Sequence, residues 1–401
     1  MNKPISIQPD FFWLGALDFD LRIFDIVMET QFGTSYNSYL LKTDSHTVLF
    51  ETVKESFFDT FLDKLKCLCV PSDIDYIVIN HTEPDHAGSL NLLLEYAPHA
   101  TVICSVVALK YLTQIINRPF KHHVVKDQET LQLGNRTLRF ILAPFLHWPD
   151  TMYTYIEEDH ILVTCDSFGA HYANPILLRS HLEENHANNY LSAYKYYFDM
   201  IMGPFKPYVL KALHKIENLP LDFICPGHGL ILDASQIPHH LALYKTWSLP
   251  VVRSKPSVVI AYVSAYGYTE SLAWQIAQGL QSARKDIDVH LFDLVSTPLE
   301  RVLTEVEHCC GLIIGSPTIL SDTLPPIWQL LTSLNPTVHK GKKATAFGSY
   351  GWSGEAVDFI VERLEQLKMN MIVPPLKILF KPNSDNLAEA FKLGESFGEN
   401  L

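Results

Sequence analysis

The stretch Asn80-His81-Thr82-Glu83-Pro84-Asp85-His86-Ala87-Gly88 decides the fold. It follows the apolar run Ile74–Ile79, which predicts a buried strand, and it precedes a helical pattern. A loop at a strand end can turn several side chains toward one point, so the stretch predicts a metal site. Four side chains of metal-binding types occur there within six positions: His81, Glu83, Asp85 and His86.

Three further candidates follow strands or lie in turns: His147, Asp166 and His228. One such residue alone is more often a satisfied polar side chain or a surface residue, but seven at strand-to-loop junctions favour a metal centre. Four imidazoles and three carboxylates exceed one coordination sphere, which favours two metals. Hard oxygen ligands, with no thiolate, shift the preference from zinc toward iron or manganese.

The first half of the chain alternates short apolar or β-branched runs with helical patterns and turn signals. Hairpin-like neighbours are common in it, which favours an α/β sandwich over a simple βαβ repeat. The expected strands are Asn37–Lys42, Thr47–Glu51, Ile74–Asn80, Thr101–Cys104, Thr137–Leu142, His160–Cys165 and Phe223–Cys225, and the expected helices include Phe57–Leu68, Ser89–Tyr96 and Tyr190–Met202.

A linker is predicted at Leu249–Pro256, where two prolines interrupt the chain without a helical period. Beyond it strands and helices alternate strictly, which predicts a doubly wound parallel sheet with both faces covered. The domains are therefore expected at residues 1–250 and 255–401. In the second, the expected strands are Ser257–Ser264, Val289–Asp293, Gly311–Gly315 and Lys343–Gly348, and the helices Glu270–Ala283, Pro298–Glu307, Pro326–Leu334 and Glu355–Leu367.

The turn after the first strand of this second domain, Ser264-Ala265-Tyr266-Gly267-Tyr268-Thr269, has the features of a phosphate site. Small hydroxyl residues and a glycine lead into a helix, whose N-terminal N–H groups bind anions. The turn has no GKS/T and no G-x-G-x-x-G, so a nucleoside triphosphate and a dinucleotide are disfavoured. A monophosphate carrying a flat ring fits the switch point of such a fold.

Two later loops could hold that ring, Gly315–Leu320 and Gly348–Gly354. Each follows a strand, and Tyr350 and Trp352 could stack on an aromatic cofactor. Any one loop of this kind is more often an ordinary turn. Three at successive strand ends favour a binding site.

The pattern H-x-E-x-D-H followed by distant His, Asp and His resembles the metallo-β-lactamase fold, whose hydrolase members usually carry H-x-H-x-D-H and bind zinc. The variant with Glu83 is similar to that of the flavodiiron proteins. The spacings agree as well, with 60, 18 and 61 residues between the successive later positions His86, His147, Asp166 and His228. The resemblance implies His81, Glu83 and His147 on one iron, Asp85, His86 and His228 on the other, and Asp166 bridging.

The second half resembles flavodoxin, which implies bound FMN. The family resemblance covers nearly the whole chain and implies a minimal two-domain form: an N-terminal metallo-β-lactamase-like αβ/βα sandwich and a C-terminal flavodoxin-like domain. No C-x-x-C pair that would mark a rubredoxin module occurs. The FMN-binding residues implied are Ser264, Tyr266, Gly267, Tyr268, Thr269, Ser316, Pro317, Thr318, Ile319, Ser349, Tyr350, Gly351, Trp352, Ser353 and Gly354.

The resemblance implies an oxidoreductase that reduces O₂ to water, NO to N₂O, or both, with electrons from FMN at two non-haem irons per chain. It also implies a small electron donor such as rubredoxin or a reductase, and a head-to-tail homodimer or a dimer of such dimers. The sequence does not choose between O₂ and NO. His171 matches a histidine that the family places beside the metals, and Lys54 and Trp148 are further pocket candidates.

Two other classes of function remain open. One is a zinc hydrolase of the lactamase fold fused to a flavodoxin-like electron-transfer domain, which Glu83 in place of histidine disfavours. The other is an electron carrier or redox sensor whose first domain is a scaffold. The complete set of seven ligands argues against that reading.

Charge and composition exclude several partners. The 401 residues carry 31 basic and 44 acidic side chains, a net charge of −13, which disfavours nucleic acid and anionic membranes. The longest uncharged run, Thr323–His339, is too short and too rich in proline to span a bilayer. The N-terminus lacks the apolar core of a signal peptide, so a cytoplasmic protein is expected. The thirteen histidines without an assigned role, including His122-His123 and His239-His240, are predicted to be solvated.

Overall fold

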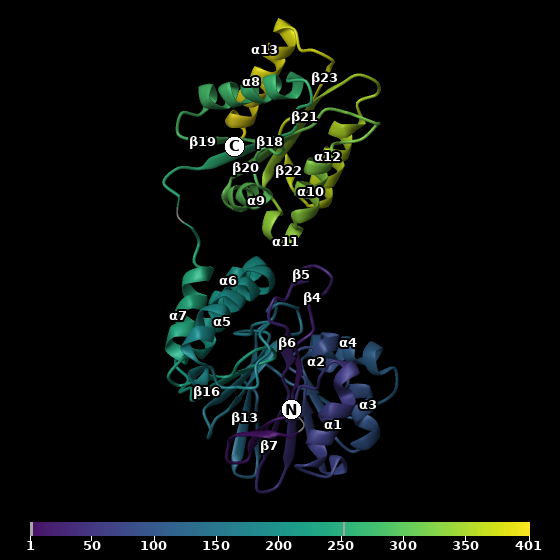
Figure 1. Ribbon diagram of the computed structural model, residues 1–401, viewed down its shortest axis with the longest axis vertical. Coiled ribbons are helices and arrows are strands. Elements are labelled where there is room, and N and C mark those ends of the chain that lie inside the picture. Colours follow the sequence, from purple (N-terminus) through teal and green to yellow (C-terminus); the bar gives the residue numbers. More distant parts are fainter. Residues whose placement is uncertain (1–2, 252) are drawn as a thin grey trace. The chain divides into compact units, whose positions relative to one another are not determined.

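The computed structural model describes residues 3–251 and 253–401, so Val252 of the predicted linker and Met1 and Asn2 lie outside the described residues. The chain divides into two compact units, Met1–Leu249 and Pro250–Leu401 (Figure 1). In the described ranges, no helix combines the length and apolar character needed to cross a membrane.

The first unit is built on a seven-stranded and a six-stranded sheet. The first sheet has the order β1-β2-β7-β8-β9-β10-β11, with bounds Ile5–Gln8, Phe11–Trp13, Tyr39–Lys42, Thr47–Phe50, Tyr76–Val78, Thr101–Cys104 and His122–Val124. The second runs β12 to β17 in chain order, with bounds Thr130–Leu133, Arg136–Leu142, Met152–Ile156, Ile161–Cys165, Phe223–Pro226 and Leu232–Asp233.

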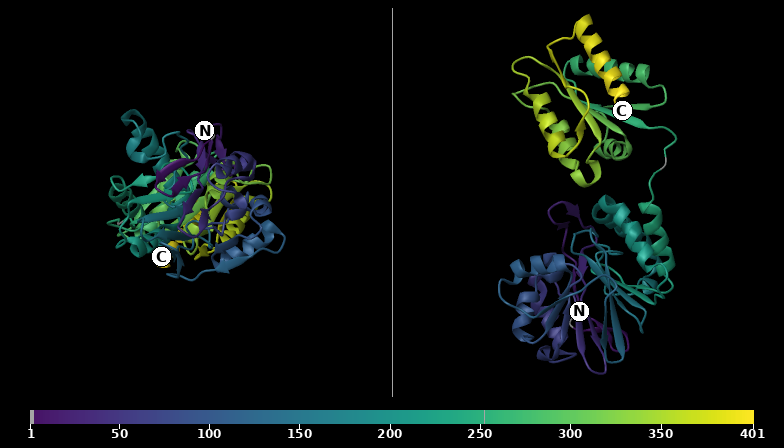
Figure 2. Two further views of the ribbon diagram at one scale, coloured as in Figure 1. Left: turned by 90° about the horizontal axis from the view of Figure 1, so that it is seen from below. Right: turned by 180° about the vertical axis from the view of Figure 1, so that it is seen from behind.

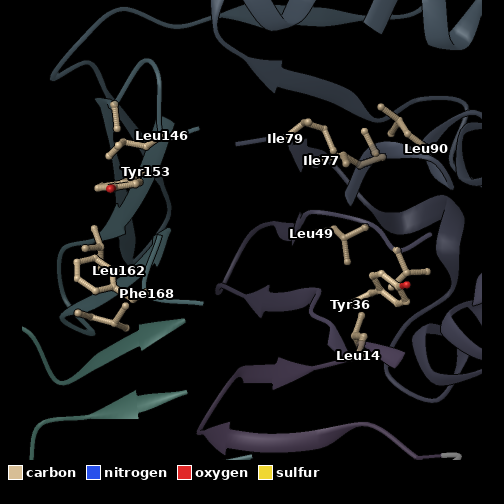
Figure 3. Packing of buried hydrophobic residues seen from close by; sticks show 14 of the residues in the cluster. Leu14, Tyr36, Leu49, Ile77, Ile79, Leu90, Leu146, Tyr153, Leu162 and Phe168 are labelled. Atoms are coloured by element: carbon tan, nitrogen blue, oxygen red, sulfur yellow. The ribbon is translucent and has the colours of Figure 1, made fainter. Parts of the chain in front are cut away.

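Alternating side chains explain why these sheets are covered on both faces. Successive side chains of β8 point to opposite faces of its sheet. Val48 and Phe50 belong to an apolar cluster shared with the second sheet, whereas Leu49 belongs to a second cluster that includes the helices. Figure 3 shows Leu49 and Ile77 in that second cluster. The covering helices are α1 (Phe58–Lys66), α3 (Leu90–Tyr96), α4 (Val106–Ile116), α5 (Glu184–Tyr197), α6 (Lys206–Ile216) and α7 (Ile237–Ser248).

Two small hairpin-like pairs complete the unit and bear on the site described below. β3 (Ala16–Asp18) pairs with β6 (Thr34–Tyr36), and β4 (Ile23–Phe24) pairs with β5 (Met28–Glu29). The turn of the β4–β5 hairpin holds Ile26 at φ 65°, which is unusual for a β-branched residue.

The second unit confirms the predicted doubly wound parallel sheet (Figure 2). Its strand order is β19-β18-β20-β21-β22, all parallel, with β23 also on β21. The strands are β18 (Ser257–Tyr262), β19 (Asp288–Asp293), β20 (Gly311–Gly315), β21 (Lys343–Tyr350), β22 (Asn370–Met371) and β23 (Leu376–Leu379). The helices are α8 (Tyr268–Ala283), α9 (Leu299–His308), α10 (Pro325–Ser333), α11 (Pro336–His339), α12 (Glu355–Gln366) and α13 (Ser384–Glu399).

Helices α8 and α13 approach each other closely at glycines. A Cβ at Gly279 would lie 2.0 Å from the Phe391 carbonyl oxygen, and a Cβ at Gly394 would lie 2.0 Å from that of Ile276. Because the obstructing atoms are backbone, a side chain at either glycine must push the helices apart.

We expect Gly279→Val to destabilise the second unit by about 3 kcal/mol, since overpacking against backbone adds to the lower helix propensity of valine. The exposed neighbour provides the control: Gln278→Val changes propensity alone and should cost less than about 1 kcal/mol. Urea unfolding of the full chain followed by circular dichroism measures both. Equal effects of the two substitutions would show that the close approach does not matter.

The prediction that all unassigned histidines are solvated is wrong for His240 and His339. His240 is 1% exposed, its Nδ1 donates to the Gln236 carbonyl (2.9 Å), and its ring packs edge-on against Tyr194. Its position on the inner face of α7 explains the difference, because that helix buries one of two adjacent histidines. Burial lowers the pKa of His240 to about 4.

This shift predicts acid sensitivity of the metal-free protein. His240 takes up a proton near pH 6.5 in the unfolded chain but only near pH 4 in the folded chain. The contribution of neutral His240 to the free energy of unfolding is therefore complete above pH 6.5 and is lost as the pH falls toward 4. Between pH 7 and pH 5 the stability should fall by about 2 kcal/mol more in the wild type than in His240→Phe. His239→Phe, at the exposed neighbour, should retain the full pH dependence. Urea unfolding at the two pH values measures these free energies of unfolding. If His240→Phe lost as much stability as the wild type between pH 7 and pH 5, the prediction would be wrong.

Candidate functional site

Strand ends of both sheets supply the seven predicted metal ligands. His81 and Glu83 follow β9, and Asp85 and His86 lie in the short helix α2 (Pro84–Ala87). His147, Asp166 and His228 follow β13, β15 and β16. All but the partly exposed His147 are buried. The sandwich therefore brings together residues up to 147 positions apart in the sequence.

These side chains form two clusters. His81, Glu83 and His147, with Asp166, have donor atoms within 4.8 Å of one another, and we call this position 1. Asp85, His86 and His228 form position 2 by the same criterion.

Asp166 faces both positions with different oxygens. Its Oδ2 lies 3.3 Å from His81 Nε2 and 3.4 Å from His147 Nε2. Its Oδ1 lies 3.0 Å from His86 Nε2 and 3.4 Å from His228 Nε2. A carboxylate so placed between two imidazole pairs has the geometry of a bridging ligand.

The donor set fits two metal ions. Neither carboxylate oxygen of Asp85 has a hydrogen bond from a described residue, and the imidazole nitrogens approach carboxylates at contact distance, as in His228 Nε2 to Asp85 Oδ2 at 3.0 Å. Burial disfavours protonation of His81, yet Asp150, Glu83 and Asp166 together raise its pKa well above the usual value. Burial likewise opposes the charge of Asp166, but the surrounding imidazoles hold its pKa well below normal. Ions at these positions would take the place of such protons.

The histidine nitrogens that point away from the metal positions have partners that no sequence pattern identifies. Asp150 Oδ1 lies 3.5 Å from His81 Nδ1, and His228 Nδ1 lies 2.6 Å from the Ser35 carbonyl oxygen. The Thr34 hydroxyl is 2.9 Å from His171 Nδ1 and 3.3 Å from His228 Nδ1.

His171 is buried beside the metal cluster and is not a surface residue. Its ring packs against those of His228 and Tyr197, at 5.1 and 4.9 Å between ring centroids. Burial and the neighbouring His228 lower the pKa of His171 far below the usual value, so the ring is neutral.

A small cavity of about 160 Å³ opens onto the ligands Glu83 and Asp85. Lys54 lines it, as do Phe24 and Asp25 of the β4–β5 hairpin. Trp148 lies on the other side of the cluster, its ring edge-on to His81 at 5.1 Å. No sequence pattern pointed to Phe24 or Asp25, because the short β4–β5 hairpin that brings them to the cavity is distant in sequence from Glu83 and Asp85.

The second unit has a larger cavity of about 540 Å³ at the ends of β18, β20 and β21. Its volume suits a cofactor with a flat ring. The N-terminus of α8 begins beside it, where the Ser264 hydroxyl accepts from the Glu270 N–H at 3.2 Å. The predicted residues that line it are Ser264, Tyr266, Tyr268, Thr269, Pro317, Thr318, Ile319, Ser349, Tyr350, Gly351 and Trp352.

Four predicted residues do not line the cavity: Gly267, Ser316, Ser353 and Gly354. Gly267 and Gly354 instead adopt φ of 78° and 82° at the starts of α8 and α12, where glycine is favoured. The buried Ser316 hydroxyl accepts from the Leu324 N–H. Lining residues that the prediction of FMN contacts left out are Ala265, Leu320, Ser321 and Phe380.

Two family models match the chain. Residues 34–229 match the model described as ODP family beta lactamase, and residues 260–394 match the flavodoxin model. The chain is also 40% identical over 400 residues to the flavo-diiron protein FprA2 of Clostridium acetobutylicum, with 99% of each chain covered.

The chain belongs to the flavodiiron proteins. Another relative, named nitric oxide reductase in Moorella thermoacetica, is 34% identical over 408 residues and covered in full. Among solved structures, rubredoxin oxygen:oxidoreductase from Desulfovibrio gigas is 28% identical with a TM-score of 0.70, covering 99% of this chain and 98% of that one. As a flavodiiron protein this chain is an oxidoreductase, and the alternative of a zinc hydrolase is not favoured.

Proposed function

We propose that this flavodiiron protein reduces O₂, NO or both at two non-haem irons held by positions 1 and 2, with electrons from FMN bound in the second unit. The observation that carries the proposal is Asp166, whose two oxygens face the two imidazole pairs separately. The names of the relatives support gas reduction, since one is a nitric oxide reductase and another a rubredoxin oxygen:oxidoreductase.

When bound, FMN in the second unit and two irons at positions 1 and 2 would supply the electron transfer that reduction of a diatomic gas needs. The chain's own residues shape the approach. Phe24 and the neighbouring hairpin narrow the cavity above Glu83 and Asp85 to a size that admits small molecules. Lys54 brings a positive charge to that cavity, which offsets the charge of the carboxylates.

His171 is proposed to relay protons to this pocket. Its Nδ1 shares a hydrogen bond with the Thr34 hydroxyl at 2.9 Å, and its Nε2 has no hydrogen-bond partner among the described residues. Because its pKa lies well below the usual value, the ring can pass a proton on without storing one.

We also propose the head-to-tail homodimer, in which the FMN of one copy lies over the irons of the other. Exposed apolar side chains surround both pockets: Tyr266, Leu320 and Trp352 at the flavin cavity, and Ile23 and Ile26 at the β4–β5 hairpin. Leu320 is 88% and Ile26 92% exposed. Apolar side chains that are exposed in the single chain in this way cost free energy of hydration and are typical of protein interfaces.

Ile26→Asp should weaken this dimer by at least tenfold, because it places a charge at the centre of the apolar contact. Iron and FMN content should stay normal while gas reduction falls. Val70→Asp makes the same change from an apolar to a charged side chain at another exposed residue of the same unit, and it should leave the dimer intact. Sedimentation at micromolar concentration tests both. A fully active wild-type monomer in dilute solution would refute the dimer.

Metal analysis of the purified protein tests the function against its alternative. Protein expressed with iron and zinc both available should contain two irons and one FMN per chain. Two zincs and no iron would favour the hydrolase. We infer a small rubredoxin-like or reductase donor, and a cytoplasmic location, which the seven free cysteines support.

A further inference from the structure

The two metal positions carry matched ligands but differ in what lies behind them. Position 1 offers two imidazoles and Glu83, position 2 offers two imidazoles and Asp85, and Asp166 faces both. With ligand sets this similar, groups that contact the ligands from outside can make the two positions unequal.

Behind His81 lies a carboxylate that is fixed in place. Asp150 Oδ2 accepts from the Thr82 N–H (2.8 Å) and the Thr82 hydroxyl (2.7 Å), which turns Oδ1 toward His81 Nδ1, 3.5 Å away. Both side chains are fully buried. Neither Oδ1 nor Nδ1 makes a hydrogen bond to a described residue, so the two buried atoms, 3.5 Å apart, are available to pair with each other.

Among the described residues, no carboxylate apart from the ligands Asp85 and Asp166 lies in ion-pair contact with the histidines of position 2. His228 Nδ1 faces the Ser35 carbonyl oxygen at 2.6 Å and the Thr34 hydroxyl at 3.3 Å, both neutral. His86 Nδ1 has no hydrogen-bond partner in the described ranges. The buried Glu51 interacts electrostatically with His86, but the two side chains are not in ion-pair contact. One Glu51 oxygen accepts from the Asn80 N–H, and the other bonds to none of the described residues.

We infer that Asp150 makes the positions unequal, so that position 1 binds a divalent metal more tightly and fills first. A carboxylate that accepts the far N–H of a ligand imidazole fixes its orientation and raises its basicity, and losing it typically lowers metal affinity 10–100-fold. A neutral carbonyl orients its imidazole without adding charge. Asp150 acts through His81 and is thus a positioning residue, and the inference rests on the proposed metal ligands.

Zinc alone is the probe, because it keeps one oxidation state. Titration of the metal-free full chain by calorimetry should resolve a tight and a weaker step. Crystals grown with one equivalent of zinc should show anomalous scattering at position 1, by His81, and little at position 2. This second measurement needs no variant, so it stands even if a variant fails to fold.

Asp150→Asn keeps the size, and its oxygen can keep the bonds from Thr82, while the group that faces His81 changes from a charged acceptor oxygen to a neutral NH₂ donor. The tight step should weaken about 10–100-fold and the weaker step should change little. Cobalt added at one equivalent should show a shifted visible spectrum in Asp150→Asn. Thr34→Val, which removes the hydroxyl behind His228, is the matched control and should leave the tight step unchanged.

Two equal steps in the wild type, zinc at position 2 first, or an unchanged tight step in Asp150→Asn would each overturn the inference. These results leave the proposed function standing, since two metals would still be bound. Failure of the protein to take up metal at these residues would instead refute the proposed function itself. The titration uses neither flavin nor gas, so loss of gas reduction for other reasons does not affect it.

Discussion

Replacement of Asp166 with alanine should remove both metals from the protein and leave FMN bound. Asp166 lies within 3.4 Å of a histidine nitrogen in each cluster, so its loss takes a ligand from both positions at once. The substitution also removes the negative charge that lies between the four ligand histidines, His81, His86, His147 and His228. Gas reduction should fall by a thousandfold or more, in line with the loss of a metal centre.

Iron and flavin assays of the same sample measure this result. Asp222→Ala, which removes an exposed carboxylate from the same unit, should keep two irons, one FMN and full activity. Retention of iron and activity in Asp166→Ala would show that the metal site lies elsewhere.

A negative charge at Ser264 should expel FMN while leaving the second unit folded. Ser264 lines the flavin cavity, and its hydroxyl accepts from the Glu270 N–H in the first turn of α8, where we place the phosphate. A carboxylate about 4 Å from a phosphate charge costs on the order of 4 kcal/mol at a protein surface, roughly a thousandfold in affinity. An aspartate oxygen can also accept from the Glu270 N–H, and a negative charge is favourable near a helix N-terminus, so Ser264→Asp should not destabilise the flavin-free unit.

Ser264→Asn is the neutral control of the same size, and it should lose much less affinity than Ser264→Asp. Flavin fluorescence on titration of the flavin-free protein with FMN measures both constants. Equal losses in the two variants would mean that size and not charge governs the site, and the phosphate would then belong elsewhere in the cavity.

The clustering of the seven predicted ligands could be expected from the sequence because each lies in a loop or short helix that follows a strand, and a strand end directs the next few side chains to one edge of its sheet. Asp150 follows no such rule: its role depends on the fold of one loop against His81, which the local sequence does not encode. Phe24 and Asp25 were missed for the same reason, since pairing of β4 with β5 brings them to the pocket.

The flavin cavity shows a similar division. The three loops that follow β18, β20 and β21 carried clear turn signals, and each contributes lining residues. Phe380 lines the cavity too, but it follows β23, a strand that joins the sheet beside β21 and gave no recognisable pattern. Within the loops, residues such as Ser316 turn inward to bond the backbone, and a sequence pattern alone does not separate them from those that face the cavity.

Rapid mixing of the anaerobically reduced protein with O₂ and, separately, with NO tests the central claim most directly. Flavin absorbance reports the return of electrons to the gas. In the wild type the reduced flavin should reoxidise within milliseconds to seconds with at least one gas, and in the iron-free Asp166→Ala protein it should reoxidise far more slowly. Equal reoxidation rates in the two proteins with both gases would contradict gas reduction at the metal centre.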